Sequence, residues 1–518
     1  MSVITDINPL ALKLSTLLAR REHLLEAILL VVVLVVAQFQ WTRQATSYVF
    51  RRIQGLLYLV WGPELIDRAY DKAQGKTFKV STPSNDHLLI TSTDLIRELI
   101  DAPLQQLSLH AVAKEILQPK HTMYGFEWQD QRGVEGTGFV RALRSLLTSH
   151  LPKFQPDLER IVKDALETEL KDIQPDGFAH ANIFPMMKRL VTRVNCFIFF
   201  GEELSQNAEF TAAALEFPQA VIFAAEFLRI TPGFARPLVA SIATNRHRAA
   251  KTLYRYLVPI VEQRLAARDL QPEEATPTDC MQWLIDTSPR KNPWTPARMV
   301  DLCRHPEHIE PLQEEAREFF HAQDSPRDVD RLLLLDSFIK ESVRCSNSDA
   351  SKLYMTRPNG TEEGIPPYSD ALVTCRRKAL VSYTFRDGSS INKGDWACVP
   401  QRAMMQDSTR YRDPQTFDGF RFARANAQLR QRKQSADVPD QKESNLTDAS
   451  PDWPIWGFGN TACPGRFYAS LVTKLVLIRL LDDWECKMLD PEAPRARTWR
   501  SSMVPRASTI VMFRKKQI

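Results

Sequence analysis

Helical periodicity alternates with short strand-like segments in the first third of the chain. Short helices are expected at residues 63–75 and 94–100, and strands at residues 77–82 and 87–93. A longer helical pattern runs from Phe139 to Leu170, and the ring of a proline inside it predicts interruptions near Pro152 and Pro156. One further apolar stretch begins at Leu332, and another covers Phe467 to Leu481. Both predict buried helices.

An apolar stretch near the N-terminus, residues 24–41, has an uninterrupted core from Ala27 to Ala37. A membrane span needs about 20 apolar residues, so the length is marginal. A cleaved signal peptide is the alternative, but no small-x-small cleavage site follows the stretch. A buried core helix would show the same pattern. Equal numbers of basic residues lie before and after this stretch, so the charge distribution does not indicate which end would face the cytosol.

The composition of the 518 residues is that of a globular protein, with 44% hydrophobic and 25% charged side chains. The net charge of +5 is small, and no zinc-finger or RNA-binding signature occurs, so no nucleic-acid partner is expected. Eight cysteines are scattered without paired metal-ligand spacing. This distribution is typical of a reduced, cytosol-facing chain rather than a disulfide framework.

The most informative stretch is residues 456–466, Trp-Gly-Phe-Gly-Asn-Thr-Ala-Cys-Pro-Gly-Arg. Gly457 and Gly459 allow a tight bend, and Pro464 fits the first turn of the apolar helix after it. Cys463 is therefore expected at a helix N-terminus, where the dipole favours a thiolate. A thiolate beside an aromatic residue such as Trp456 suits axial ligation of haem iron.

Two other interpretations of this stretch compete with haem ligation. Gly457, Gly459 and Ala462 also fit a dinucleotide-binding fingerprint, with acidic residues about twenty positions further on. That fingerprint requires a preceding strand, yet Pro451 and Pro454 stand there, so the nucleotide interpretation fails. A structural cysteine buried at a turn is the simpler alternative.

The stretch resembles the haem-binding loop of the cytochrome P450 monooxygenases. The resemblance implies that Cys463 ligates the iron of haem b, and that the cofactor is contacted by Trp456, Gly457, Thr461 and Gly465. Trp456 stands where most members have Phe. Thr461 replaces the usual Arg or His, which leaves one contact to a haem propionate without its expected residue.

Two further motifs of the family occur in the right order. Glu341 and Arg344 stand three residues apart on a predicted helix, although Glu314 and Arg317 match equally well by chance. Residues 417–422 match the family's aromatic-Arg motif, and Arg421 is expected to join the Glu–Arg pair in a buried network. Three motifs in this order identify the chain as similar to fungal microsomal members.

The family also places a basic residue on a helix near residues 139–150, where it contacts a haem propionate. Arg141 and Arg144 lie on one face of this helix and either is a candidate for this role, of which Arg144 is the one assigned. The pair Trp128 and Arg132 has the family's spacing, but three glycines closely follow it and disfavour a helix. A solvated arginine would explain each position equally well.

Two departures from the family are expected. Members carry a long central helix over the distal face of the haem, whose acid and threonine manage protons during dioxygen cleavage. Residues 294–300 resemble the approach to that helix and join directly to residues 301–307, which resemble the segment on its far side. A helix of roughly 30 residues is thus apparently deleted at 300/301. Conversely, an aperiodic insertion is expected within 346–375, which points to misplaced exon boundaries, a splice variant or a degenerate paralogue.

The resemblance implies a mainly α cytochrome P450 fold, a helical haem domain with a small β-rich part, behind an N-terminal transmembrane anchor. The expected parts are an anchor region, residues 1–45, and a haem domain, residues 60–518. The implied partners are NADPH-cytochrome P450 reductase, a lipophilic secondary metabolite and the membrane. The implied location is the endoplasmic reticulum membrane, single-pass, with a cytosolic catalytic domain. No catalytic residue is assigned, and the competing class is a haem-binding membrane protein without turnover.

Residues 209–240, rich in apolar and aromatic side chains, resemble the family's substrate-access region. This resemblance implies a greasy substrate or contact with the membrane surface. A simple core helix would explain the same residues.

Overall fold

The structure is a computed structural model, and its helices and strands are described over a defined part of the chain. Those residues are 53–55, 57–58, 61–124, 146–270, 278–287, 332–346, 370–371, 373–431, 434–499 and 502–517. The chain divides into two compact units, one of residues 1–59 and 81–84 and the other of residues 60–80 and 85–518. The elements below belong to the second unit, apart from the last residue of β1.

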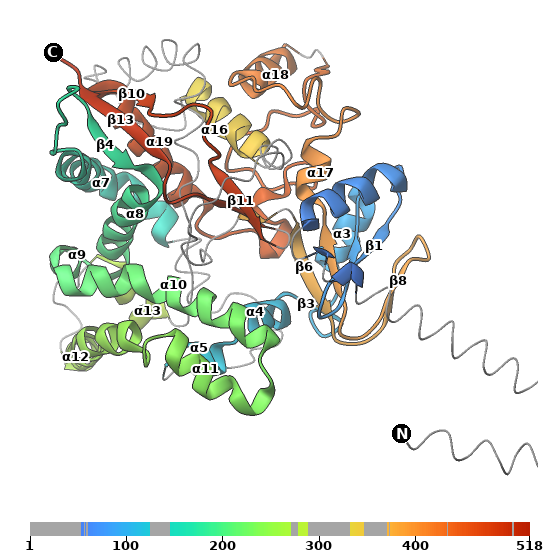
Figure 1. The fold of residues 1–518 in the computed structure, drawn as a ribbon, viewed down its shortest axis with the longest axis horizontal. Coiled ribbons are helices and arrows are strands. Elements are labelled where there is room, and N and C mark those ends of the chain that lie inside the picture. The colour runs from blue at the N-terminus through green and yellow to red at the C-terminus, as the bar shows by residue number, and fades with distance from the viewer. Residues whose placement is uncertain are drawn as a thin grey trace, which may run out of the picture. The chain divides into compact units, whose positions relative to one another are not determined.

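Helices make up most of the described part (Figure 1). The longer ones are α3 (Thr93–Asp101), α4 (Leu109–Leu117), α7 (Thr148–Glu169), α8 (Ile183–Phe200), α10 (Ala208–Ile230), α11 (Arg236–Ala243), α12 (Arg248–Leu270), α13 (Cys280–Thr287), α16 (Leu333–Ser346), α18 (Arg421–Arg430) and α19 (Arg466–Asp483). The shorter ones are α5 (Pro119–Thr122), α9 (Glu202–Gln206), α17 (Gln401–Met405), η3 (Gly233–Ala235), η7 (Pro454–Trp456) and η8 (Gly459–Thr461). The predicted helices at 94–100 and 467–481 are confirmed as α3 and α19.

The strands in the described part of the chain form four small sheets. One has the order β1 (Phe78–Ser81), β2 (Asp86–Leu89), β9 (Trp396–Val399), β6 (Thr374–Ala379), β3 (Leu107–Ser108). The others are β10 (Trp484–Met488), β13 (Ile510–Lys515), β4 (Ala179–Asn182); β11 (Ala496–Trp499), β12 (Ser502–Pro505), β5 (Asp370–Ala371); and β7 (Tyr383–Thr384), β8 (Ser390–Ile391). Figure 1 shows β4 beside β13, two strands distant in sequence whose pairing brings Ala181 opposite Val511.

α7 corrects one prediction, because it continues through both Pro152 and Pro156 without a break. A proline inside a helix costs about 3 kcal/mol. The buried face of the helix includes Phe154, Leu158 and Ile161 and packs against α8 and α19. Burying each such side chain contributes about 1.5–3 kcal/mol, so the whole face outweighs the two lost hydrogen bonds.

α19 lies in the main core and is buried on almost every side. Leu471, Val472, Leu475, Val476 and Ile478 are all nearly inaccessible to solvent. The same core includes buried side chains from α7, α8, α16, β10 and β13. The loop that carries Cys463 enters this helix directly, so the packing of α19 fixes one end of the loop.

Several predictions lie outside the described residues. They are the 24–41 span, Arg141 and Arg144, the pairs Trp128–Arg132 and Glu314–Arg317, the 300/301 junction and most of the 346–375 stretch.

Candidate functional site

The loop before α19 bends sharply at Gly457. Its φ is +74°, and a Cβ built there would lie 3.0 Å from the carbonyl oxygen of Thr461. Because that contact is with backbone, a larger residue could be accommodated only by moving the loop. The bend brings the chain from η7 back toward η8, so that residues 456 and 463 become hydrogen-bonded neighbours.

Cys463 is held by main-chain contacts on both sides. Its amide donates to the carbonyl oxygen of Trp456 at 2.7 Å, and its own carbonyl accepts from Nη1 of Arg466 at 3.1 Å. α19 begins at Arg466 with Gly465 as the N-cap residue. The predicted position of Cys463 just ahead of a helix is confirmed, but Pro464 lies in the turn before α19 and not inside its first turn.

The other cysteines in the described part of the chain differ from Cys463 in their surroundings. None of the seven described cysteines forms a disulfide. Burial raises the pKa of Cys196 and that of Cys398 to about 12 each, so both remain protonated thiols at neutral pH. Cys463 is half-buried and stands at the start of a helix.

Arg377 is a site residue that the sequence analysis missed. It lies on β6, is 1% exposed, and donates from Nη2 to Oγ1 of Thr461 at 2.8 Å. Its Nε has no hydrogen-bond partner among the described residues. Burial lowers the pKa of Arg377 below its ordinary value, yet a guanidinium remains charged. A buried cation therefore faces the same loop at the position where Thr461 replaces a basic residue.

A bulge in β6 explains why the strand approaches the loop at this point. Thr374 pairs with Val399 and Arg377 with Ala397, so β6 has one residue more than β9 between the two pairs. Cys375, inside the bulge, has a φ of +50°. Bulges bend a strand and redirect its side chains. In the bent strand, Oγ1 of Thr374 also donates to the carbonyl oxygen of Pro454 at 3.2 Å.

The predicted Glu–Arg–Arg network is confirmed. Arg344 donates to Glu341 from Nε at 2.8 Å and from Nη2 at 2.7 Å, and Arg421 donates from Nε to both carboxylate oxygens at 3.2 Å. The side chains of Glu341 and Arg344 are 0% exposed, and that of Arg421 is 3% exposed. Burial acts to lower the pKa of Arg344, but its bonds to Glu341 outweigh this and raise the pKa.

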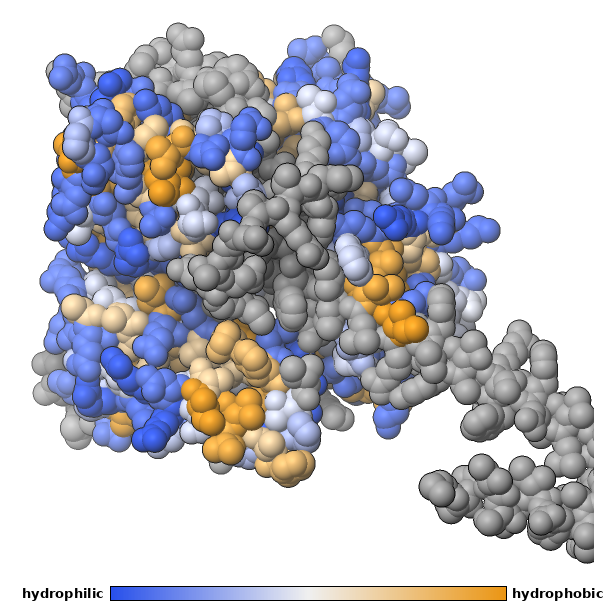
Figure 2. All heavy atoms as spheres, in the orientation of Figure 1, coloured by the Kyte–Doolittle hydropathy of each residue, from blue (hydrophilic) through white to orange (hydrophobic). Residues whose placement is uncertain are grey.

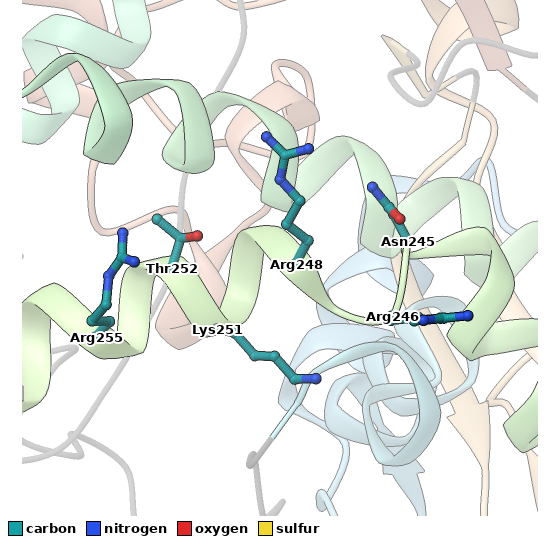
Figure 3. Close-up of a pocket in the computed structure, with 6 residues that line it drawn as sticks. All are labelled: Asn245, Arg246, Arg248, Lys251, Thr252 and Arg255. Atoms are coloured by element: carbon teal, nitrogen blue, oxygen red, sulfur yellow. The ribbon is translucent and has the colours of Figure 1, made fainter.

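Two surface clefts occur away from the cysteine loop. One, of about 360 Å³, lies along Asn245–Arg255 and is lined mainly by basic side chains (Figure 3). The other, of about 1230 Å³, lies between α3 and the β7–β8 hairpin. Neither includes a residue of the 456–466 loop.

Comparison with known proteins decides the family. The family model "Cytochrome P450" matches residues 63–299 and 368–512, which is well over half of the chain. The chain belongs to the cytochrome P450 family. The interruption between residues 299 and 368 coincides with the region where the sequence predicts a deletion and an insertion.

Curated relatives of this P450 are fungal enzymes. Cytochrome P450 monooxygenase AN1598 of Emericella nidulans is 25% identical over 485 residues, covering 88% of this chain and 83% of the relative. Ent-kaurene oxidase of Gibberella intermedia is 27% identical over 496 residues, covering 89% and 85%. The structure of retinoic acid-bound cyanobacterial CYP120A1 matches with a TM-score of 0.58 at 16% identity, over 87% of this chain and 94% of that one.

These comparisons confirm the predicted family, the mainly α P450 fold, the monooxygenase class of the fungal secondary-metabolism type and a cysteine-ligated haem as the cofactor. The site fits such a group. The unpartnered Nε of buried Arg377 suits an anionic carboxylate. Apart from its chain neighbours, no atom of the described residues lies within 4 Å of a Cβ built at Gly465, so the described backbone beside Cys463 leaves room for a flat ring.

Proposed function

We propose that Cys463 is the axial ligand of the haem iron in this P450. The observation that carries the proposal is its geometry: half-buried, hydrogen-bonded through its amide to Trp456, and placed just ahead of α19. Trp456, Gly457, Thr461 and Gly465 would contact the cofactor from the same loop. Arg377 and Arg144 are the proposed partners of the propionates, with Arg377 supported by its hydrogen bond to Thr461.

The proposed reaction is oxidation of a lipophilic secondary metabolite, such as a terpenoid, meroterpenoid or polyketide. NADPH-cytochrome P450 reductase would supply the electrons. When bound, haem supplies the chemistry by which dioxygen is activated and one oxygen atom enters the substrate. The chain's own contribution is to coordinate through the Cys463 thiolate and to neutralise carboxylates with Arg377. Support for the substrate class comes from relatives such as the Gibberella ent-kaurene oxidase.

A second candidate function is a haem-binding protein without turnover, which is favoured by the interrupted family match between residues 299 and 368. If this second candidate is correct, the 518-residue chain should give no NADPH-dependent product with reductase present. The helix proposed to be missing at 300/301 carries the acid and hydroxyl that deliver protons, and general acid catalysis alone contributes roughly 10²–10⁴ in rate.

Product analysis by mass spectrometry with the pathway's candidate substrates checks this expectation. The matched comparison is a chain that also contains the genomic sequence lying between the codons for Val300 and Asp301, which should restore turnover if it encodes the helix. A clean product from the unmodified chain would show that another segment closes the distal side. It would also remove the second candidate.

For localisation, we propose an anchor at residues 24–41 and a second, peripheral membrane contact at α11. Three apolar side chains at helical spacing are exposed on η3 and α11: Phe234 of η3 by 90%, and Leu238 and Ile242 of α11 by 66% and 71%. Figure 2 shows the apolar surface they belong to. The basic cleft is next in sequence, with Arg248 and Arg255 on one side of α12 and Lys251 on the other (Figure 3). Apolar and basic side chains together suit an anionic membrane surface.

Among the described residues, one helix, Ala208–Arg229, is long and apolar enough to cross a membrane by length and composition. It packs against α8 and α12, and Phe210, Val221 and Leu228 are buried. The core-helix interpretation therefore accounts for one face of α10 only, because 28% of this apolar stretch is buried. The interpretation as an exposed contact surface fits α11.

Deletion of residues 1–45 is expected to convert tight membrane association into a weak, salt-sensitive one. The remaining attraction would come from the basic cleft and from the small apolar face of α11. Salt screens the charges of the basic cleft and so weakens its part of the attraction. Microsomal fractionation at low and high salt measures the change. In the truncated chain, Leu238→Ser with Ile242→Ser should lower the residual binding further. Undiminished association of the truncated chain in high salt would mean that the 209–240 region or another surface is the main anchor.

A further inference from the structure

Residues 444–447, called here the anchor segment, are held by side chains from α16 and α18. Lys340, which is 0% exposed, donates to the carbonyl oxygen of Ser444 at 3.0 Å and also to its hydroxyl. The amide of Leu446 donates to Oδ2 of Asp336 at 2.8 Å. From α18, Oδ1 of Asn426 accepts from the amide of Ser444 at 3.0 Å. The segment lies in a stretch of mostly polar residues, 439–450, but Ser444 and Leu446 are buried.

The anchor segment in turn holds the chain on both sides of Cys463. The carbonyl oxygen of Leu446 accepts from Nε1 of Trp456 at 2.5 Å and from Nε1 of Trp453 at 3.3 Å. The carbonyl oxygen of Thr447 accepts from Nε of Arg466 at 2.9 Å. The backbone carbonyl of Trp456 accepts from the amide of Cys463, and the side chain of Arg466 donates to the carbonyl oxygen of Cys463.

A continuous series of hydrogen bonds therefore runs from a carboxylate on α16 to the proposed iron ligand. It passes from Asp336 to the Leu446 amide, from the Leu446 carbonyl to the Trp456 indole, and from the Trp456 carbonyl to the Cys463 amide. Asp336 also pairs with Lys474 of α19 at 2.8 Å, where Lys474 is 1% exposed. One carboxylate thus ties together α16, the anchor segment and the helix that begins after the cysteine.

We propose that Asp336 and Lys340 are positioning residues for the haem ligand, acting through the anchor segment on Trp456, Arg466 and the backbone of Cys463. This inference rests on the proposed function of Cys463. Hydrogen bonds around a ligand, and the residues that orient it, control both the hold on a metal centre and its reduction potential. Buried, fully connected polar networks of this kind also favour a single local conformation.

The test is Asp336→Asn in the full chain. Hydrogen exchange in the peptides that cover residues 456–466, measured by mass spectrometry, should accelerate by roughly tenfold at the Cys463 amide, the factor expected when about one hydrogen bond is lost. In the haem-loaded protein, transfer of haem to apomyoglobin should accelerate by a similar factor, and the midpoint potential of the iron should shift. Glu443→Gln is the matched control, because Glu443 stands next to Ser444 but forms an exposed pair with Arg430 at 2.7 Å. It should change none of these readouts.

Two further variants separate positioning from simple loss of the Lys474 partner. Lys474→Met in the Asp336→Asn chain removes the buried ammonium group, and the fast exchange at Cys463 should persist. Trp456→Phe keeps an aromatic ring but removes the indole donor, so Asp336→Asn should add little to its effect. Additive effects of Asp336→Asn and Trp456→Phe, or full rescue by Lys474→Met, would overturn the proposal. Amide exchange needs no haem, so it tests the anchor segment even if the proposed iron ligand is wrong.

Discussion

Replacing Cys463 by alanine is expected to abolish the thiolate-type spectrum of the reduced carbon monoxide complex. Of the described cysteines, Cys463 is the one on the 456–466 loop, with its amide bonded to Trp456 and its helix beginning at Arg466. Only a thiolate produces this spectral type, because its charge and polarisable sulfur act directly on the iron. The difference spectrum of dithionite-reduced protein, with and without carbon monoxide, measures the loss.

Two other cysteines serve as controls for this substitution. Cys486 is partly exposed, as Cys463 is, while Cys398 is fully buried with a raised pKa of about 12. Cys486→Ala and Cys398→Ala should retain the thiolate-type spectrum. If either control loses it while Cys463→Ala keeps it, the ligand has been assigned to the wrong residue.

Glu341→Ala is expected to prevent stable folding. The substitution leaves Arg344 and Arg421 buried without their shared carboxylate, at side-chain exposures of 0% and 3%. Removing one member of a buried ion pair costs about 3–5 kcal/mol, a large part of the roughly 5–15 kcal/mol that stabilises a typical domain. Soluble yield and the thermal unfolding temperature should both fall sharply, and haem should not be retained.

A pair on the surface provides the comparison. Glu485 pairs with Arg514, and both side chains are about half exposed, at 46% and 54%. Glu485→Ala should change stability by about 1 kcal/mol or less, because solvent screens such pairs. A Glu341→Ala chain that unfolds at the temperature of the unmodified chain would show that the network does not stabilise the fold.

The parts of the site that are local in sequence could be predicted from it. Cys463, Gly457 and the start of α19 fall within a few residues of one another, so loop chemistry and helix propensity place them together. Glu341 and Arg344 are three residues apart, and Arg421 belongs to a motif of its own. The cysteine loop and the helix after it were predicted from local spacing. The choice of Glu341 and Arg344 over Glu314 and Arg317, and the role of Arg421, were implied by the resemblance to the family.

Two tertiary contacts that neither spacing nor the resemblance indicated were missed. Arg377 reaches Thr461 across 84 positions from a bulged strand, and nothing in the sequence around it marks the bulge. The bond between Asp336 and the Leu446 amide spans 110 positions and involves a backbone group, so residue type gives no signal. The break expected at Pro152 and Pro156 was wrong because packing of the whole α7 face outweighs a local propensity.

The most direct test of haem ligation by Cys463 is the carbon monoxide difference spectrum of the purified, haem-reconstituted 518-residue chain in its reduced form. We expect haem uptake and a thiolate-type band, present whether or not the chain turns over any substrate. A stoichiometric haem complex whose band is of the nitrogen-ligated type, and which is unchanged by Cys463→Ala, would contradict this assignment.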